Sequence, residues 1–232
     1  MGKENLLLIG NTGSGKSYLL NSVGGNFNSG FNAVHGLTEE CDYCDVNVGN
    51  VTMRLIDVPG LLEATDEKIK RNADAITQAL RMSGSFKLIF VLAECAGRVL
   101  PSDLFTIAKV LTAIDFSIDV GVIINKVPSE DLDLYNQHDT KENIIKQLNS
   151  VANNKINKSW FSIIPRFRRD DRYGATPYMT ELLGNMKYQP IANVTEIRAT
   201  IKEYNAFVKF LQKVGKAIID LWEKFVYEYN LF

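Results

Sequence analysis

The chain contains Gly10-Asn11-Thr12-Gly13-Ser14-Gly15-Lys16-Ser17, a complete G-x-x-x-x-G-K-[ST] phosphate loop. An apolar run at 5–9 precedes it and a helical pattern opens at 17–23, so strand, loop and helix follow in the required order. A glycine-rich turn that matched by chance would have no reason to lie between these elements. The glycines let successive N–H groups face one anion, Lys16 adds charge for the outer phosphates, and the Ser17 hydroxyl is the expected Mg²⁺ ligand. The predicted nucleotide-binding residues here are Asn11, Thr12, Gly13, Ser14, Gly15, Lys16, Ser17 and Tyr18.

A second motif follows a strand-like run at 51–57 and reads Asp57-Val58-Pro59-Gly60. A carboxylate at the end of a core strand beside the phosphate loop can hold the Mg²⁺ shell, which makes Asp57 the predicted metal residue. The Gly60 N–H is placed to meet a γ-phosphate. An ATPase more often has Glu after this Asp, whereas Val58 stands here, so the pair of motifs favours a GTPase-type switch.

Composition excludes several classes of protein. The 232 residues are 46% hydrophobic, enough for one large domain with a buried core. A net charge of −1 gives no reason to expect nucleic-acid binding. We see neither an apolar stretch long enough to span a membrane nor a signal peptide, and therefore expect a cytoplasmic protein.

The cysteines suggest no disulfide framework, because there are only three, Cys41, Cys44 and Cys95. Cys41-x-x-Cys44 with His35 nearby raises the alternative of a zinc site, but a closed structural site needs a fourth ligand. We therefore interpret these thiols as buried or half-buried members of a strand.

Strand-like and helix-like patterns alternate along the chain, which is typical of a mostly parallel sheet with helices on both faces. Strands are expected at 5–9, 41–48, 51–57, 86–93, 119–125 and 160–164, with Gly49-Asn50 making an antiparallel hairpin. Helices are expected at 17–23, 68–82, 102–114 (begun by Ser102-Asp103) and 140–151. We predict an α/β fold, with the nucleotide-binding domain at 1–188 and a helical extension at 189–232. Ligands of such sheets bind beyond the carboxyl ends of the strands, where Gly10, Asp57 and Asn125 converge.

Thr38 lies in the loop after the first helix, where a switch threonine supplies a second hydroxyl to Mg²⁺. The alternative is a solvated loop residue. The features that carry a resemblance to a known family are the phosphate loop, Leu37-Thr38 before Cys41, Asp57–Gly60, and the apolar run 86–93 that leads to Gly97-Arg98. In these features the chain resembles the GIMAP family of immunity-associated, avirulence-induced-gene-type GTPases, a septin-like branch. The resemblance covers about residues 5–127. It implies a guanine-nucleotide switch that forms homodimers through its nucleotide face. Related proteins oligomerise or associate with intracellular membranes, so the resemblance implies these properties as well.

The base-reading element departs from a standard guanine-binding domain. Asn125-Lys126 supplies the first half of Asn-Lys-x-Asp, with Asn125 for the purine and the Lys126 stem along its face. Pro128 stands where the guanine-reading Asp is expected. The loop at 129–131 (Ser-Glu-Asp) offers alternative acceptors. GTP stays favoured, with weaker selectivity over ATP expected, and an ATP-using enzyme is a third alternative.

Hydrolysis is expected to be slow, because Leu61 stands where many small GTPases carry the glutamine that orients water. Arg98 is a candidate arginine finger offered to a partner's phosphates, with an ordinary exposed arginine as the alternative. Glu63 and Glu94 are candidate water-positioning groups. The catalytic set is thus Lys16, Thr38, Gly60 and Arg98.

The C-terminal part reads as a long amphipathic helix. Asn193 to Glu196 has the form of a capping box, and apolar residues then recur at three and four positions, with a break expected near Gly215. The early half is expected to pack on the domain, and the later half is apolar enough for a partner helix or a membrane surface. The sequence therefore predicts a slow, dimer-stimulated GTPase switch or, alternatively, a non-hydrolysing nucleotide-gated scaffold.

Overall fold

A computed structural model describes residues 3–28, 41–48, 51–95, 98–168 and 170–228, with side chains of the last helix described as far as residue 214. One sheet runs through the molecule in the order β2-β3-β1-β4-β5-β6, and β7 pairs with β4 beside this path. The strands are β1 (Glu4–Ile9), β2 (Asp42–Val48), β3 (Val51–Asp57), β4 (Ser85–Ala93), β5 (Val120–Val127), β6 (Ile156–Pro165) and β7 (Gln189–Pro190). The helices are α1 (Lys16–Ser22), α2 (Asp66–Leu80), α3 (Pro101–Ala113), α4 (Leu132–Asn136), α5 (His138–Ala152), α6 (Thr176–Asn185) and α7 (Ile201–Glu228), with a 3₁₀ turn η1 (Ser129–Asp131).

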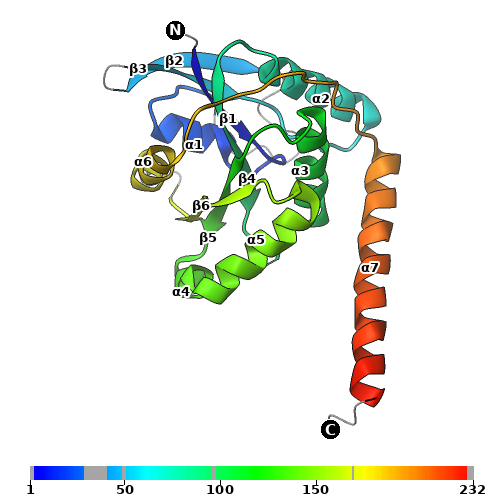
Figure 1. Ribbon diagram of the computed structural model, residues 1–232. Helices are drawn as coiled ribbons and strands as arrows, with labels where there is room; N and C mark the ends of the chain where they lie inside the picture. Colours follow the sequence, from blue (N-terminus) through cyan, green and yellow to red (C-terminus); the bar gives the residue numbers. More distant parts are fainter. Residues whose placement is uncertain (1–2, 29–40, 49–50, 96–97, 169, 229–232) are drawn as a thin grey trace.

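The predicted α/β architecture is confirmed. β1 pairs in parallel with β3 and β4, and the parallel ladder continues through β5 to β6. β2 runs antiparallel to β3, as the hairpin prediction requires, and the turn at 49–50 lies outside the described residues. The carboxyl ends of the parallel strands therefore meet along one edge of the sheet (Figure 1).

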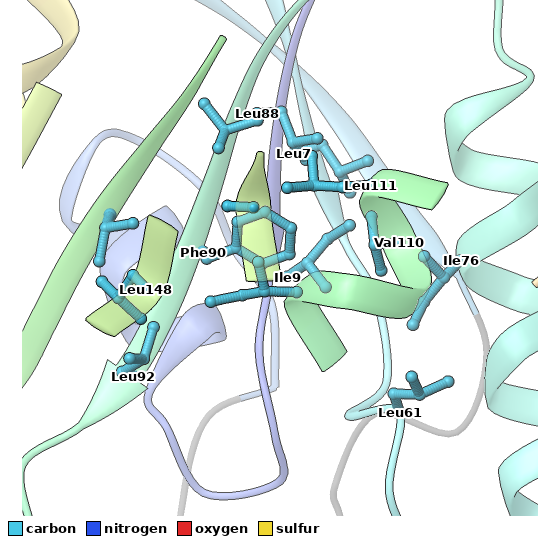
Figure 2. Close-up of a cluster of buried hydrophobic side chains, with 14 of the residues drawn as sticks. Leu7, Ile9, Leu61, Ile76, Leu88, Phe90, Leu92, Val110, Leu111 and Leu148 are labelled. Atoms are coloured by element: carbon cyan, nitrogen blue, oxygen red, sulfur yellow. The ribbon is translucent and has the colours of Figure 1, made fainter. Parts of the chain in front are cut away.

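Helices cover both faces of the sheet. Side chains alternate along a strand, so Leu7 and Ile9 of β1 belong to one core and Leu6 and Leu8 to the other. The first core packs against α2, α3 and α5, and Figure 2 shows part of it around Phe90. The second core packs against α1 and α6. This two-sided burial explains why the sequences of β1, β4 and β5 are mostly apolar rather than alternating.

The start of α3 differs from the prediction. The helix begins at Pro101, a residue whose fixed φ suits the first helical position, and no side chain caps its N-terminus. Asp103 therefore lies inside the first turn rather than capping it. Its carboxylate instead accepts a hydrogen bond from Asn11 in the phosphate loop, 2.8 Å away. A tertiary contact thus replaces the expected local one.

The predicted start of the C-terminal helix was also wrong. Asn193 has φ of 54°, in the left-handed region, and residues 193–200 form no helix. Helix α7 begins at Ile201, where Thr200 Oγ1 accepts a hydrogen bond from the Glu203 N–H at 3.1 Å and Asp66 of α2 accepts one from the Ile201 N–H at 2.7 Å. The capping residues are therefore Thr200 and Asp66, the second supplied by another helix.

The first half of α7 packs on the domain, as predicted. The Phe105 ring of α3 meets Tyr204 and Phe207 edge-on, with centroids 5.5 Å apart in each pair. The break expected at Gly215 is absent, since α7 runs unbroken to Glu228 and leaves the domain near α2 (Figure 1). None of the described helices is long and apolar enough to cross a membrane. The chain division at residue 188 stays a prediction, and β7 just after it belongs to the sheet.

Candidate functional site

The phosphate loop joins β1 to α1 at the carboxyl edge of the sheet, as the sequence predicts. Gly15 has φ of 96°, a conformation that strains any residue with a side chain. A Cβ on Gly15 would also lie 2.4 Å from the Asn125 side-chain nitrogen. The loop conformation therefore requires glycine at position 15, and the Asn125 side chain of β5 lies directly against it.

Lys16 is buried and its ammonium group curls back onto the loop. Its Nζ donates to the Gly10 carbonyl at 3.0 Å and to the Asn11 carbonyl at 3.4 Å. Burial lowers its pKa to about 8, and the nearby Asp57 and Glu63 charges oppose that shift. The two carbonyls are neutral dipoles, so a bound phosphate would give this desolvated cation an anionic partner that it lacks here.

Ser17 and Asp57 lie together at the predicted metal position. The Ser17 hydroxyl donates to Asp57 Oδ2 at 2.6 Å, and Asp57 is only 1% exposed. A hydroxyl and a carboxylate are the hard oxygen ligands that Mg²⁺ prefers, so the donor set fits this ion. Thr38, the third predicted metal residue, lies outside the described residues.

Asn125 and Lys126 lie within the end of β5, and both contact the phosphate loop. Asn125 Nδ2 donates to the Ser14 carbonyl at 2.8 Å, and Lys126 Nζ donates to the Gly13 carbonyl at 2.5 Å. Burial, and then the charge of Arg166, lower the pKa of Lys126. The candidate base-reading pair is thus tied directly to the phosphate-binding segment. Pro128 precedes η1, which carries the alternative acceptors at 129–131.

A polar network between the loop and α3 was not predicted. Besides the bond to Asp103, the Asn11 side chain accepts a hydrogen bond from Thr106 Oγ1 at 3.0 Å. Burial raises the pKa of Asp103 to about 6, against which the Asn11 bond acts. The spacing of Asp103 and Thr106, three residues apart on one helix face, was the only sequence signal for this pairing.

Gly60 and Thr12 bring the second motif against the loop. A Cβ on Gly60 would lie 2.3 Å from the Thr12 nitrogen, so only glycine permits this approach. The Thr12 hydroxyl donates to Glu63 Oε1 at 2.7 Å. Leu61 is completely buried, packed in the core that Figure 2 shows.

Two further predicted residues lie at the margins of the site. The Tyr18 hydroxyl donates to the Asp171 carbonyl at 3.0 Å, and its ring lies 6.5 Å from Phe167, so this side chain is engaged with the loop after β6. Arg98 is exposed on the loop between β4 and α3, where its N–H bonds the Cys95 carbonyl at 3.0 Å.

The described part of the chain holds no group of three or more His, Cys, Asp and Glu side chains arranged for a metal ion. Cys41 and Cys44 are half-buried, and burial raises the pKa of both thiols, that of Cys41 to about 11. His35 lies outside the described residues.

Comparison with known proteins agrees with this geometry. Residues 5–126 match the family described as 50S ribosome-binding GTPase. Over 103 residues the chain is 32% identical to GTPase Der of Rickettsia typhi, a match that covers 44% of this chain and 22% of Der. The fold resembles a dimerization-deficient variant of Toc33 from Arabidopsis thaliana, with a TM-score of 0.57 and 14% identity over 82% of this chain and 87% of that one. It also resembles Era in complex with MgGDPNP and part of 16S ribosomal RNA, with a TM-score of 0.50 and 20% identity over 70% and 50% of the two chains.

Proposed function

The chain belongs to the 50S ribosome-binding GTPase family, and we propose that it works as a guanine-nucleotide switch that hydrolyses GTP slowly and dimerises in the triphosphate state. The family and the fold establish a P-loop GTPase domain. The slow rate, the dimer and the GIMAP-like branch go further and are our proposals, as are the roles of individual site residues.

The observation that carries the proposal is the Ser17–Asp57 pair, 2.6 Å apart beside the buried Lys16. The pair would hold Mg²⁺, while Lys16 and the loop N–H groups would hold the phosphates. When bound, Mg²⁺ neutralises phosphate charge. A Toc33 structure with GDP and Mg²⁺ shares the fold at a TM-score of 0.56 and 15% identity, which supports this assignment.

Guanine is the base we propose, although Pro128 replaces the expected Asp. Asn125 and Lys126 contact the loop through the Ser14 and Gly13 carbonyls, so a base bound there would be coupled to the phosphates. Loss of one buried acceptor weakens the discrimination between guanine and adenine. We therefore expect GTP to bind more tightly than ATP, by a smaller margin than in a domain with the complete motif.

Slow hydrolysis follows from the burial of Leu61, because a core side chain cannot orient water. Arg98 is exposed on the same edge of the sheet as the loop, where a second domain could receive it as an arginine finger. Toc33 was solved as a dimerization-deficient variant, so that protein dimerises, which supports proposing a dimer here.

A scaffold without turnover is the second candidate, favoured by the outer part of α7. Phe210 is 59% exposed and Val214 is 40% exposed, on a helix that extends to Glu228. Such side chains suit a partner helix or a membrane surface.

Titration with GTP, GDP and ATP, each with and without Mg²⁺, tests the proposal. We expect Mg²⁺-dependent binding of GTP, binding of GDP, and weaker binding of ATP. Tighter binding of ATP than of GTP would refute the guanine assignment. Absence of binding to all three would refute the switch itself.

A further inference from the structure

We propose that Glu63, held over the phosphate loop by the Thr12 hydroxyl, orients the water that attacks the γ-phosphate. The inference rests on the proposed function, since it concerns hydrolysis at the same site. It assigns one catalytic residue, Glu63, and one positioning residue, Thr12.

The geometry places the Glu63 carboxylate at the phosphate end of the site. Glu63 Oε1 accepts a hydrogen bond of 2.7 Å from Thr12, a residue of the loop itself. Gly60 packs against the Thr12 backbone and Glu63 bonds the Thr12 side chain, so both ends of the segment 60–63 meet the loop at Thr12. The charge of Glu63 also opposes, after that of Asp57, the lowering of the Lys16 pKa by burial.

The other candidates for this task have different partners. Leu61 is completely buried. Glu94, which the sequence offered as an equal alternative, accepts a hydrogen bond from the Tyr135 hydroxyl of α4 at 3.1 Å. Asp57 accepts one from Ser17 at the metal position. Asp103 also bonds the loop, but through the Asn11 side chain that it shares with Thr106 of α3. Glu63 is the carboxylate that bonds Thr12, the loop residue packed against Gly60.

The chemistry needs no further reactant. Glu63 accepts a hydrogen bond from water, whose oxygen forms a bond to the γ-phosphorus while the bond to the β–γ bridging oxygen breaks. The electron pair of that bond leaves with GDP. The water proton passes by way of Glu63 to an oxygen of the released phosphate, so the carboxylate is regenerated. Such positioned proton acceptors contribute about 10²- to 10⁴-fold to a rate.

Thr12 restricts where the carboxylate can lie. Without the hydroxyl, Glu63 would be a half-exposed side chain with several rotamers, and only a fraction of them would face the loop. A serine at this position would keep the donor, whereas valine would keep the shape and remove it.

Single-turnover hydrolysis of bound GTP, with nucleotide affinity measured separately, tests the inference. Glu63→Ala removes the carboxylate that orients the water, and we expect it to slow hydrolysis about 100-fold while GDP affinity changes less than about threefold. Thr12→Val should slow hydrolysis about 10-fold, and Thr12→Ser should restore most of the rate. Glu67→Ala, which removes an exposed carboxylate from the first turn of α2, is the matched control and should leave the rate unchanged.

The outcomes separate this inference from the proposed function. Normal nucleotide binding with unchanged hydrolysis in Glu63→Ala would overturn the inference alone. A wild-type protein that binds GTP without hydrolysing it would overturn both the inference and the hydrolysis in the proposed function, and would leave the scaffold. Equal rates in Thr12→Val and Thr12→Ser would overturn the positioning role. A wild-type protein that binds no guanine nucleotide would refute the proposed function as well.

Discussion

Replacing Asp103 by Asn should make the protein more stable at neutral pH, because this carboxyl is buried beside the phosphate loop. Its side chain belongs to a residue only 6% exposed, and burial raises its pKa from the usual 3.8 to about 6. A carboxyl whose folded pKa lies above its unfolded pKa binds more protons in the folded state, so stability falls as pH rises from about 3.8 to about 6. Asp103→Asn removes that loss and keeps an oxygen for Asn11.

The magnitude follows from the shift. Because the folded pKa lies about two units above the unfolded one, ionised Asp103 destabilises the folded state by about 3 kcal/mol above pH ~7. Near pH ~4.5 this destabilisation is about 1 kcal/mol. The free energy of unfolding of Asp103→Asn relative to wild type should therefore be about 2 kcal/mol more favourable at pH ~7.5 than at pH ~4.5. Urea denaturation of both proteins at both pH values measures this difference.

Asp133→Asn, which removes an exposed carboxylate from α4, provides the matched background for loss of one charge. A difference between wild type and Asp103→Asn that is equal at the two pH values would refute the reasoning. So would a destabilised variant at pH ~7.5, since it would mean that the ionised carboxylate stabilises the loop through Asn11.

Three further results are expected. Lys16→Ala should weaken GDP binding about 100-fold because it removes the buried cation of the loop. Calorimetry measures this, with Lys70→Ala at an exposed position as the control, and an unchanged affinity would contradict the phosphate-loop assignment. Arg98→Ala should retain nucleotide affinity and lose the rise of specific activity with protein concentration, and a wild-type activity independent of concentration would remove the trans-acting finger. Thr200→Ala should lower the free energy of unfolding by about 1 kcal/mol through loss of the Glu203 N–H bond, and a change below about 0.3 kcal/mol in urea denaturation would count against this cap.

The sheet and the central motifs could be predicted because they depend on local signals. The apolar runs of β1, β4 and β5 are strands buried on both faces, and the phosphate loop has a fixed spacing between strand and helix. Helix α6 was not predicted because its apolar pattern is short, with only Met179 and Leu182 buried within it.

Tertiary competition explains the remaining errors. Asn193 to Glu196 satisfies the rule for a capping box, yet the Thr195 N–H donates to the Ala113 carbonyl at 2.8 Å instead of starting a helix. Asp103 likewise does not cap α3, because its carboxylate accepts a hydrogen bond from Asn11 instead. The contact between Thr12 and Glu63 joins residues 51 positions apart, and periodicity carries no information at that separation.

The most direct test of the central claim is the Mg²⁺ dependence of triphosphate binding in wild type and Asp57→Ala. Affinity for a non-hydrolysable GTP analogue and for GDP is measured with Mg²⁺ and with chelator. We predict that Mg²⁺ tightens triphosphate binding by wild type at least about 10-fold, and that Asp57→Ala loses most of this gain while its GDP affinity in chelator stays within about threefold. An equal Mg²⁺ effect in both proteins would contradict the metal site at Ser17 and Asp57.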